Sequence, residues 1–118
     1  MTIAGVREMN DRELLEMAAR ALGYKAVEWQ KGFGMVAIGQ PEKSNQMFNP
    51  LEYDGHAFRL AVDLGIGVQS YSALKYSHAG AETINQSIAI KEQHLVDPYA
   101  ATRRAIVLAA AEIGKNMP

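Results

Sequence analysis

Apolar positions of helical period mark the first element of the chain. From about Asp11 to Leu22, apolar residues recur every three or four positions and leave the charged residues for solvent. Asn10 and Glu13 have the spacing of a capping box, and Gly23 is typical of the residue that ends a helix. The pattern predicts an amphipathic helix with both ends marked.

Two later segments have the same period. Apolar residues share a broad face from about Asp54 to Leu64, and Gly65 follows directly. In the last segment, Asp97 is typical of an N-cap, Pro98 suits the first helical position, and the helix is predicted to end at Gly114. Because this helix is rich in alanine, we expect it to pack closely against its neighbours.

Segments of strand character lie between the helices and predict two hairpins. Residues 25–30 and 35–38 form the first, with glycines between them. Residues 68–76 and 83–90 are rich in β-branched and aromatic residues and predict the second, with residues 78–81 separating its strands.

The order α-β-β-α-β-β-α predicts an α+β fold, in which a four-stranded antiparallel sheet from two hairpins is covered by three helices. The length of 118 residues indicates a single domain over residues 1–118, with a flexible N-terminus over residues 1–10. The polar segment from Gly39 to Glu52 is too long for a tight turn and is a natural place for a ligand or a lid. Alanine-rich helix faces on a small core favour a homo-oligomer.

Composition narrows the class of protein. Twelve basic and thirteen acidic side chains give a net charge of −1, so no global positive field attracts nucleic acid or an anionic membrane. The absence of cysteine excludes disulfides and thiolate sites and fits a reducing cytoplasm. The longest apolar run, Ala105 to Ala111, is far shorter than the roughly 20 residues that span a bilayer. The N-terminus lacks the apolar centre of a signal peptide, so we expect a soluble intracellular protein.

Patterns that indicate catalysis are missing from the sequence. The three histidines have no metal-ligand spacing, and the serines have no nucleophile motif. The glycines form neither a dinucleotide-binding nor a P-loop pattern. Glu52 and Asp54 stand at a helix start, where carboxylates more often cap amides than act as acid and base. We therefore expect no enzyme, no metal and no cofactor.

Arginines within apolar helices are the main candidates for binding. Arg59, Arg103 and Arg104 lie among alanine, leucine and isoleucine, where a guanidinium favours a planar anionic partner. Tyr99 lies one turn before Arg103 and shares its face, so the two could present a ring and a fork of donors together. The alternative is a salt bridge, for instance from Arg59 to the carboxylate four residues on. Because Arg103 and Arg104 point about 100° apart, at most one of them is expected to face inward.

Aromatic residues on the expected strands add a second set of candidates. If Tyr71 and Tyr76 flank a cleft near Arg59, they form a stacking platform for a base while the arginine binds phosphate. Ordinary packing of aromatics in hairpins is the alternative interpretation.

Three blocks of the sequence resemble the NinX-type accessory proteins of tailed bacteriophages. The blocks begin at Asp11-Arg12-Glu13-Leu14-Leu15, at Phe48-Asn49-Pro50-Leu51 and at Asp97-Pro98-Tyr99-Ala100-Ala101, and together they span nearly the whole chain. The spacing of these three blocks along the chain is also similar to that of phage α-β-α sandwich domains. More distantly, it is similar to that of the Thoeris anti-defence sponge family. Such sponges sequester cyclic nucleotide-like immune signals at subunit contacts.

The resemblance to the sponges implies a set of ligand-binding residues in this chain. Arginines on helices, with an asparagine and an aromatic on strands, hold the ligand in that family. The positions that could take these parts here are Arg59, Arg103 or Arg104, Asn85, and Tyr71 or Tyr76, with Tyr99 and Asn49 as further candidates.

The sequence thus supports two functional hypotheses for a phage protein in the host cytoplasm. In the first, an anti-defence protein binds and sequesters a cyclic nucleotide or cyclic ADP-ribose-type signal without cleaving it. In the second, an accessory protein binds a host or phage protein and has no small-molecule ligand. The first requires arginines and an aromatic that converge on one cavity. The second requires an exposed apolar patch.

Overall fold

The computed structural model describes residues 5–24, 26–31, 35–39, 46–84 and 86–117. A short 3-10 helix, η1, precedes three α-helices and six strands. In chain order the elements are η1 Val6–Glu8, α1 Asp11–Ala21, β1 Ala26–Gln30, β2 Met35–Gly39, β3 Gln46–Phe48, α2 Asp54–Leu64, β4 Gly67–Tyr71, β5 Tyr76–Glu82, β6 Ser87–Gln93 and α3 Pro98–Lys115. The α+β class with three α-helices, predicted from the sequence, is confirmed.

The sheet architecture differs from the prediction. Instead of one four-stranded sheet, the strands form two antiparallel three-stranded sheets in the orders β1-β2-β3 and β4-β5-β6. Two strands escaped the prediction: β3 is only three residues long and lies within the segment expected to be a loop, and β5 was divided between a strand and a turn. Because each hairpin gains a third strand of its own, neither needs the other to complete a sheet.

The turn of the second hairpin was also misplaced. Residues 72–75 join β4 to β5, and Lys75 takes the left-handed conformation there (φ 62°). No glycine, proline or asparagine marks this turn. Gly80, which suggested a turn, instead lies within β5 opposite Gly67.

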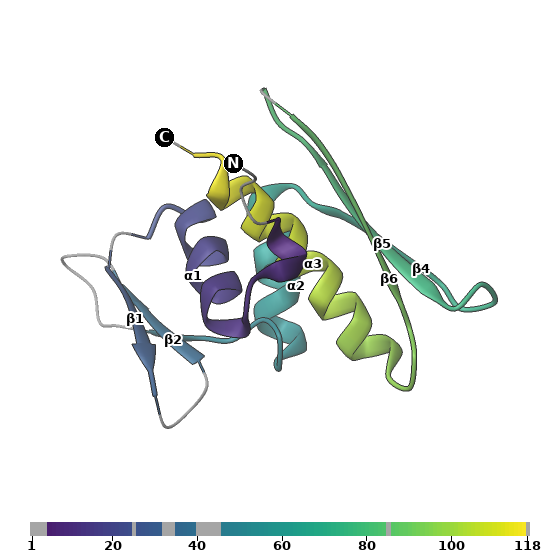
Figure 1. Cartoon of the computed structure of the whole chain (residues 1–118), viewed down its shortest axis with the longest axis horizontal. Coiled ribbons are helices and arrows are strands. Elements are labelled where there is room, and N and C mark those ends of the chain that lie inside the picture. The colour runs from purple at the N-terminus through teal and green to yellow at the C-terminus, as the bar shows by residue number, and fades with distance from the viewer. Residues whose placement is uncertain (1–4, 25, 32–34, 40–45, 85, 118) are drawn as a thin grey trace.

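The helices lie between the two sheets (Figure 1). One sheet packs against α1, while α3 covers β5 and β6 of the other. This layer order, sheet–helices–sheet, differs from the helix–sheet–helix order that the resemblance implied. The central helix α3 is buried on nearly all sides, as its residues 105–111 show.

Small residues allow α3 to approach α1 closely. A Cβ atom at Gly114 would lie 2.0 Å from the carbonyl oxygen of Met17, so only glycine fits there. Gly114 therefore lies inside α3, which ends at Lys115, and does not terminate the helix as predicted. The predicted caps are present: Asn10 and Glu13 form a capping box, and Asp97 caps α3 with Pro98 following.

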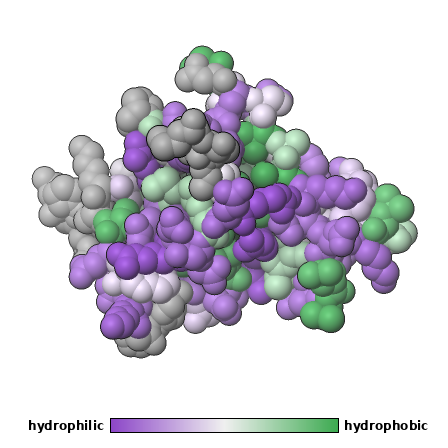
Figure 2. Space-filling view, in the orientation of Figure 1, coloured by the Kyte–Doolittle hydropathy of each residue, from purple (hydrophilic) through white to green (hydrophobic). Residues whose placement is uncertain are grey.

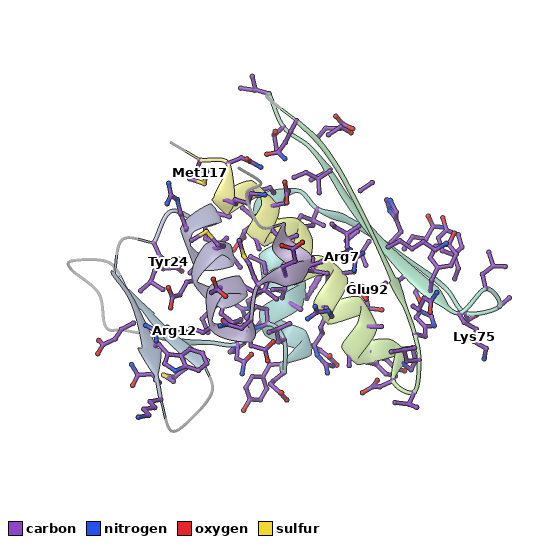
Figure 3. The ribbon with its side chains drawn as sticks, viewed as in Figure 1. Arg7, Arg12, Tyr24, Lys75, Glu92 and Met117 are labelled. Atoms are coloured by element: carbon purple, nitrogen blue, oxygen red, sulfur yellow. The ribbon has the colours of Figure 1, made fainter. Side chains whose placement is uncertain are left out.

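The N-terminal segment is attached to the far edge of the second sheet. The sequence predicts flexibility over residues 1–10. Residues 1–4 lie outside the described residues, and Val6 is buried in the core. Arg7 donates hydrogen bonds to Glu92 (2.5 Å) and to the carbonyl oxygen of Lys91 (2.6 Å), and Figure 3 shows Arg7 and Glu92 side by side. In the described part of the chain, no helix is long and apolar enough to cross a membrane.

Candidate functional site

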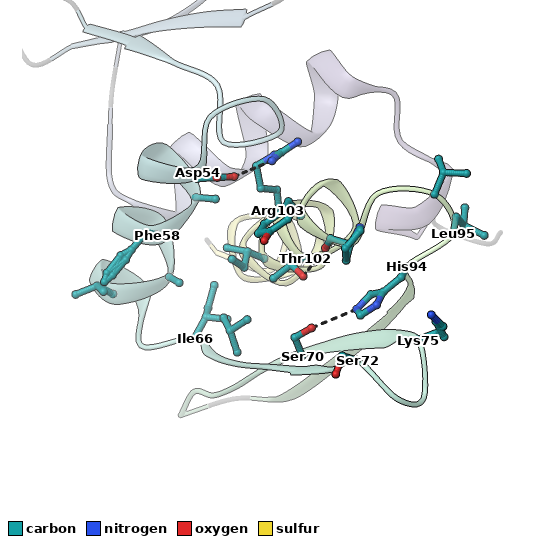
Figure 4. A pocket seen from close by; sticks show the side chains of 18 residues that line it. Asp54, Phe58, Ile66, Ser70, Ser72, Lys75, His94, Leu95, Thr102 and Arg103 are labelled. Carbon is teal, nitrogen blue, oxygen red and sulfur yellow. Dashed lines mark hydrogen bonds and ion pairs between the residues drawn. The ribbon is translucent and has the colours of Figure 1, made fainter.

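A cleft of about 870 Å³ lies between α2, the first half of α3 and β4 (Figure 4). The connection from β6 to α3, residues 94–97, closes one end of it. The cleft exists because α3 covers the helix-facing side of the sheet over β5 and β6 but makes few contacts with β4. Its volume falls in the range of ligand-binding sites, roughly 300–1,000 Å³.

Large apolar side chains surround the cleft and remain exposed. They come from every element around it: Phe58 and Val62 from α2, Val68 from β4, Leu95 and Val96 from the connection, and Tyr99 from α3. Val96 is fully exposed, and Leu95 is 84% exposed. Figure 2 shows hydrophobic surface where the β6–α3 connection reaches solvent. We call these six residues the apolar rim.

Leu95 adopts an unusual backbone conformation for its residue type. Its φ of 54° lies in the left-handed region, which costs a residue other than glycine roughly 1–2 kcal/mol. The neighbouring backbone holds it there, because the His94 N–H donates to the carbonyl oxygen of Lys75 (2.8 Å) and the Asp97 N–H to that of His94 (3.2 Å). The chain thus fixes two apolar side chains in solvent at the mouth of the cleft.

A hydrogen-bonded network of polar side chains forms the floor of the cleft. The Nε2 atom of the buried His94 lies 2.9 Å from the hydroxyl of Ser77 and 3.3 Å from that of Ser70. The hydroxyl of Ser77 lies 2.6 Å from that of Thr102, which donates to the carbonyl oxygen of Pro98 (2.7 Å). The network ties β4, β5, the β6–α3 connection and α3 together.

The direction of these hydrogen bonds gives His94 a structural role. Because the Thr102 proton goes to the Pro98 carbonyl, Thr102 accepts from Ser77, and Ser77 in turn accepts from His94. Nε2 therefore carries a proton and cannot take one from Ser70, although the two lie within reach. Ser70 and His94 therefore lack the arrangement of a nucleophile with its general base.

Arg103 occupies the edge of the cleft but is already bound. Its Nε donates to the carbonyl oxygen of Leu51 (2.9 Å), and its Nη1 contacts the carboxylate of Asp54 (2.7 Å). This ion pair joins the first turn of α2 to α3. A ligand would have to share the guanidinium with Asp54 or displace it.

The other residues expected to bind a ligand do not converge on the cleft. Of the seven that the structure describes, Tyr99 and Arg103 line it and the other five do not. Arg59 is exposed on α2, outside the lining, while Arg104 lies 3.7 Å from Glu92. As predicted, Arg103 and Arg104 point to different neighbours.

The predicted stacking tyrosines lie on the opposite face of the sheet. Tyr71 and Tyr76 pair with each other across the β4–β5 hairpin, with ring centroids 4.8 Å apart, and Lys91 lies 4.2 Å over the Tyr76 ring. They fit the alternative interpretation of hairpin packing. Asn49 is buried in the segment between β3 and α2, and Asn85 lies outside the described residues.

The sequence interpretation missed most residues of the cleft. Leu95 and Val96 stand between a strand and an Asp-Pro helix start, in a connection too short to bury them, and this is the signal that could have been used. The three histidines have no metal-ligand spacing in the sequence, so His94 was not among the predicted site residues. Among the described residues, no group of histidines and carboxylates could hold a metal ion.

His56 is a titratable group close to the cleft, on α2. Its Nδ1 accepts a hydrogen bond from the backbone N–H of Asn49 (2.9 Å), which requires that nitrogen to be unprotonated. Burial, and then the charge of Arg59, lower the pKa of His56 below its ordinary value of 6.5. The folded chain therefore holds this imidazole neutral more strongly than the unfolded chain does.

We expect this shift to make stability depend on pH. Since the pKa is lower in the folded chain, the contribution of His56 is complete above about pH 6.5 and is lost as the pH falls toward the folded-state value. Urea unfolding at about pH 7.5 and about pH 5 checks this for the wild type and His56→Gln. The wild type is expected to lose more stability on acidification than the variant, and equal losses would refute the assignment.

Comparisons with known proteins add no relationship: no protein-family model matches the chain, and no curated protein is similar to it in sequence.

Proposed function

We propose that this chain is a non-enzymatic binding protein whose cleft receives an apolar segment of a partner protein. The observation that carries the proposal is the apolar rim, in which six large apolar side chains stand exposed around a single cleft. Exposed apolar surface gains roughly 25 cal/mol for each Å² that a partner covers. Contiguous apolar patches on soluble proteins are typical of interaction sites.

The strained connection supports the same function. A left-handed Leu95 is unfavourable for the isolated chain, and the side chain it presents gains nothing from solvent. Both costs are offset if a partner covers Leu95 and Val96. The resemblance to phage accessory proteins suggests that the partner is a host or phage protein in the host cytoplasm.

A selection of short random peptides tests the proposal. Peptides displayed on a library are selected on the immobilised protein, and the affinities of the best binders are measured by fluorescence polarisation. We expect binders rich in apolar residues. Replacing Val62 by glutamate places a charge on the exposed part of the rim and is expected to weaken their binding about tenfold or more.

Ile84 provides a matched control for this experiment. It is a fully exposed apolar residue at the β5–β6 turn, and it does not line the cleft. Ile84→Asp is expected to leave peptide affinity unchanged. If no peptides are enriched, or if Ile84→Asp and Val62→Glu weaken binding equally, the cleft is not the binding site.

A second candidate function rests on Tyr99 and Arg103, which line the cleft together. A ring beside a guanidinium suits a nucleotide, so the cleft could hold a cyclic nucleotide or cyclic ADP-ribose-type signal. Thermal unfolding with cyclic dinucleotides, cyclic trinucleotides and cyclic ADP-ribose isomers distinguishes this candidate. A nucleotide that raises the Tm of the wild type and of Arg59→Ala, but not that of Tyr99→Ala, would favour a nucleotide over a peptide as the ligand of the cleft.

A further inference from the structure

We propose that the partner segment binds as an added β-strand along the free edge of β4, with an acidic side chain next to Lys75. This inference rests on the proposed function and specifies the form of its partner. An extended segment that joins a sheet edge gains main-chain hydrogen bonds, while alternate side chains enter pockets and give specificity.

The two edges of the β4-β5-β6 sheet differ in how they are protected. At the β6 edge, Arg7 donates to the carbonyl oxygen of Lys91, and Glu92 lies between Arg7 and Arg104. Charged residues and a covering segment are common devices that prevent edge strands from pairing.

Within the part of the chain that the structure describes, the β4 edge has none of these devices. Its sequence, Gly-Val-Gln-Ser-Tyr, contains neither a charged residue nor a proline, and β5 is its one partner strand among the described residues. The first four residues of β4 are exposed. Alternate N–H and C=O groups of such a strand point away from the sheet and remain available to another chain.

The register of β4 connects this free edge to the cleft. Val68 pairs with Ala79 and Ser70 with Ser77, so these two β4 residues share the face that α3 covers on the rest of the sheet. Both line the cleft. Side chains of an added strand also alternate between faces, so every second one would enter the cleft and meet the apolar rim.

Charge sets the remaining requirement on the segment. Lys75 and Arg103 are cations of the cleft lining, and Asp54 already neutralises Arg103. No carboxylate among the described residues pairs with Lys75, which lies at the turn end of β4. The occupant that fits is an extended segment with apolar residues at alternate positions and an aspartate or glutamate near Lys75.

Backbone methylation of the peptide selected above tests the added strand. Two versions of its strongest binder carry N-methyl groups at every second residue, one at odd and one at even positions. In an added strand only one of these sets of N–H groups faces β4. We expect one version to lose affinity roughly tenfold or more and the other to stay within about threefold.

A second measurement locates the contact on the protein. Bound peptide is expected to slow amide hydrogen exchange within β4. In addition, Lys75→Glu is expected to weaken the binding of peptides that carry an acidic residue about threefold. Lys31→Glu, an exposed lysine outside the lining, is the matched control and is expected to have no effect.

The outcomes separate the inference from the proposed function. If both methylated versions bind equally, or if β4 amides exchange at an unchanged rate, the added strand is overturned. In that case, loss of binding in Val62→Glu still leaves the cleft as the binding site. If no peptide binds at all, the proposed function itself fails.

Discussion

Replacing Gly114 by alanine is expected to destabilise the protein by roughly 3 kcal/mol or to prevent its folding. The added Cβ would lie 2.0 Å from the carbonyl oxygen of Met17 and 2.9 Å from its carbonyl carbon. Backbone atoms of a helix cannot move aside as a flexible side chain can, so α1 and α3 would have to separate. Equilibrium unfolding in urea measures the loss, with circular dichroism to show whether the variant folds.

Gly55→Ala is the matched control for this substitution. Gly55 lies in α2, and no atom apart from its chain neighbours and the backbone of the same helix lies within 4 Å of a Cβ built there. Alanine is the better helix former by up to roughly 1 kcal/mol, so this variant is expected to be equally or more stable. If Gly114→Ala were as stable as Gly55→Ala, the close contact between α1 and α3 would be disproved.

Removal of the His94 side chain is expected to lower the free energy of unfolding by about 2–4 kcal/mol. His94 is 5% exposed and supplies the proton that Ser77 accepts, so His94→Ala leaves both a cavity and an unsatisfied hydroxyl. The floor of the cleft should loosen as well, because the network holds the β6–α3 connection. Urea unfolding gives the loss of stability, and peptide affinity reports the state of the cleft.

His78→Ala serves for comparison, because His78 lies on the opposite face of the same sheet and is half-buried. The His78→Ala substitution is expected to lower the free energy of unfolding by less than about 1 kcal/mol. Equal losses in the two variants would mean that the network under the cleft contributes nothing specific.

Local signals in the sequence located the helices well. The capping pair Asn10 and Glu13 and the Asp-Pro start of α3 satisfy backbone groups within one turn, so nearby residues suffice to predict them. Gly23 and Gly65 take positive φ at helix ends, as their positions indicated. Gly114 was misread because glycine serves two needs, a left-handed backbone and close packing, and only the position of α1 distinguishes them.

The sheets and the cleft depend on contacts that are distant in sequence. The turn at residues 72–75 contains no glycine, proline or asparagine, so its position follows from the pairing of β4 with β5. Arg103 stands among apolar residues in the sequence, but its bond to Asp54 depends on how α2 packs against α3. The short connection before Asp97-Pro98 indicates that Leu95 and Val96 are exposed, but the cleft that they border depends on which part of the sheet α3 leaves uncovered.

Mapping where a selected peptide touches the protein tests the binding role of the cleft most directly. A photoreactive group is placed at the centre of the strongest peptide, and the cross-linked residues are identified by mass spectrometry. We expect adducts on α2, on β4 and on residues 94–99. Adducts spread over the surface, or concentrated at the β5–β6 turn around Ile84, would contradict this role of the cleft.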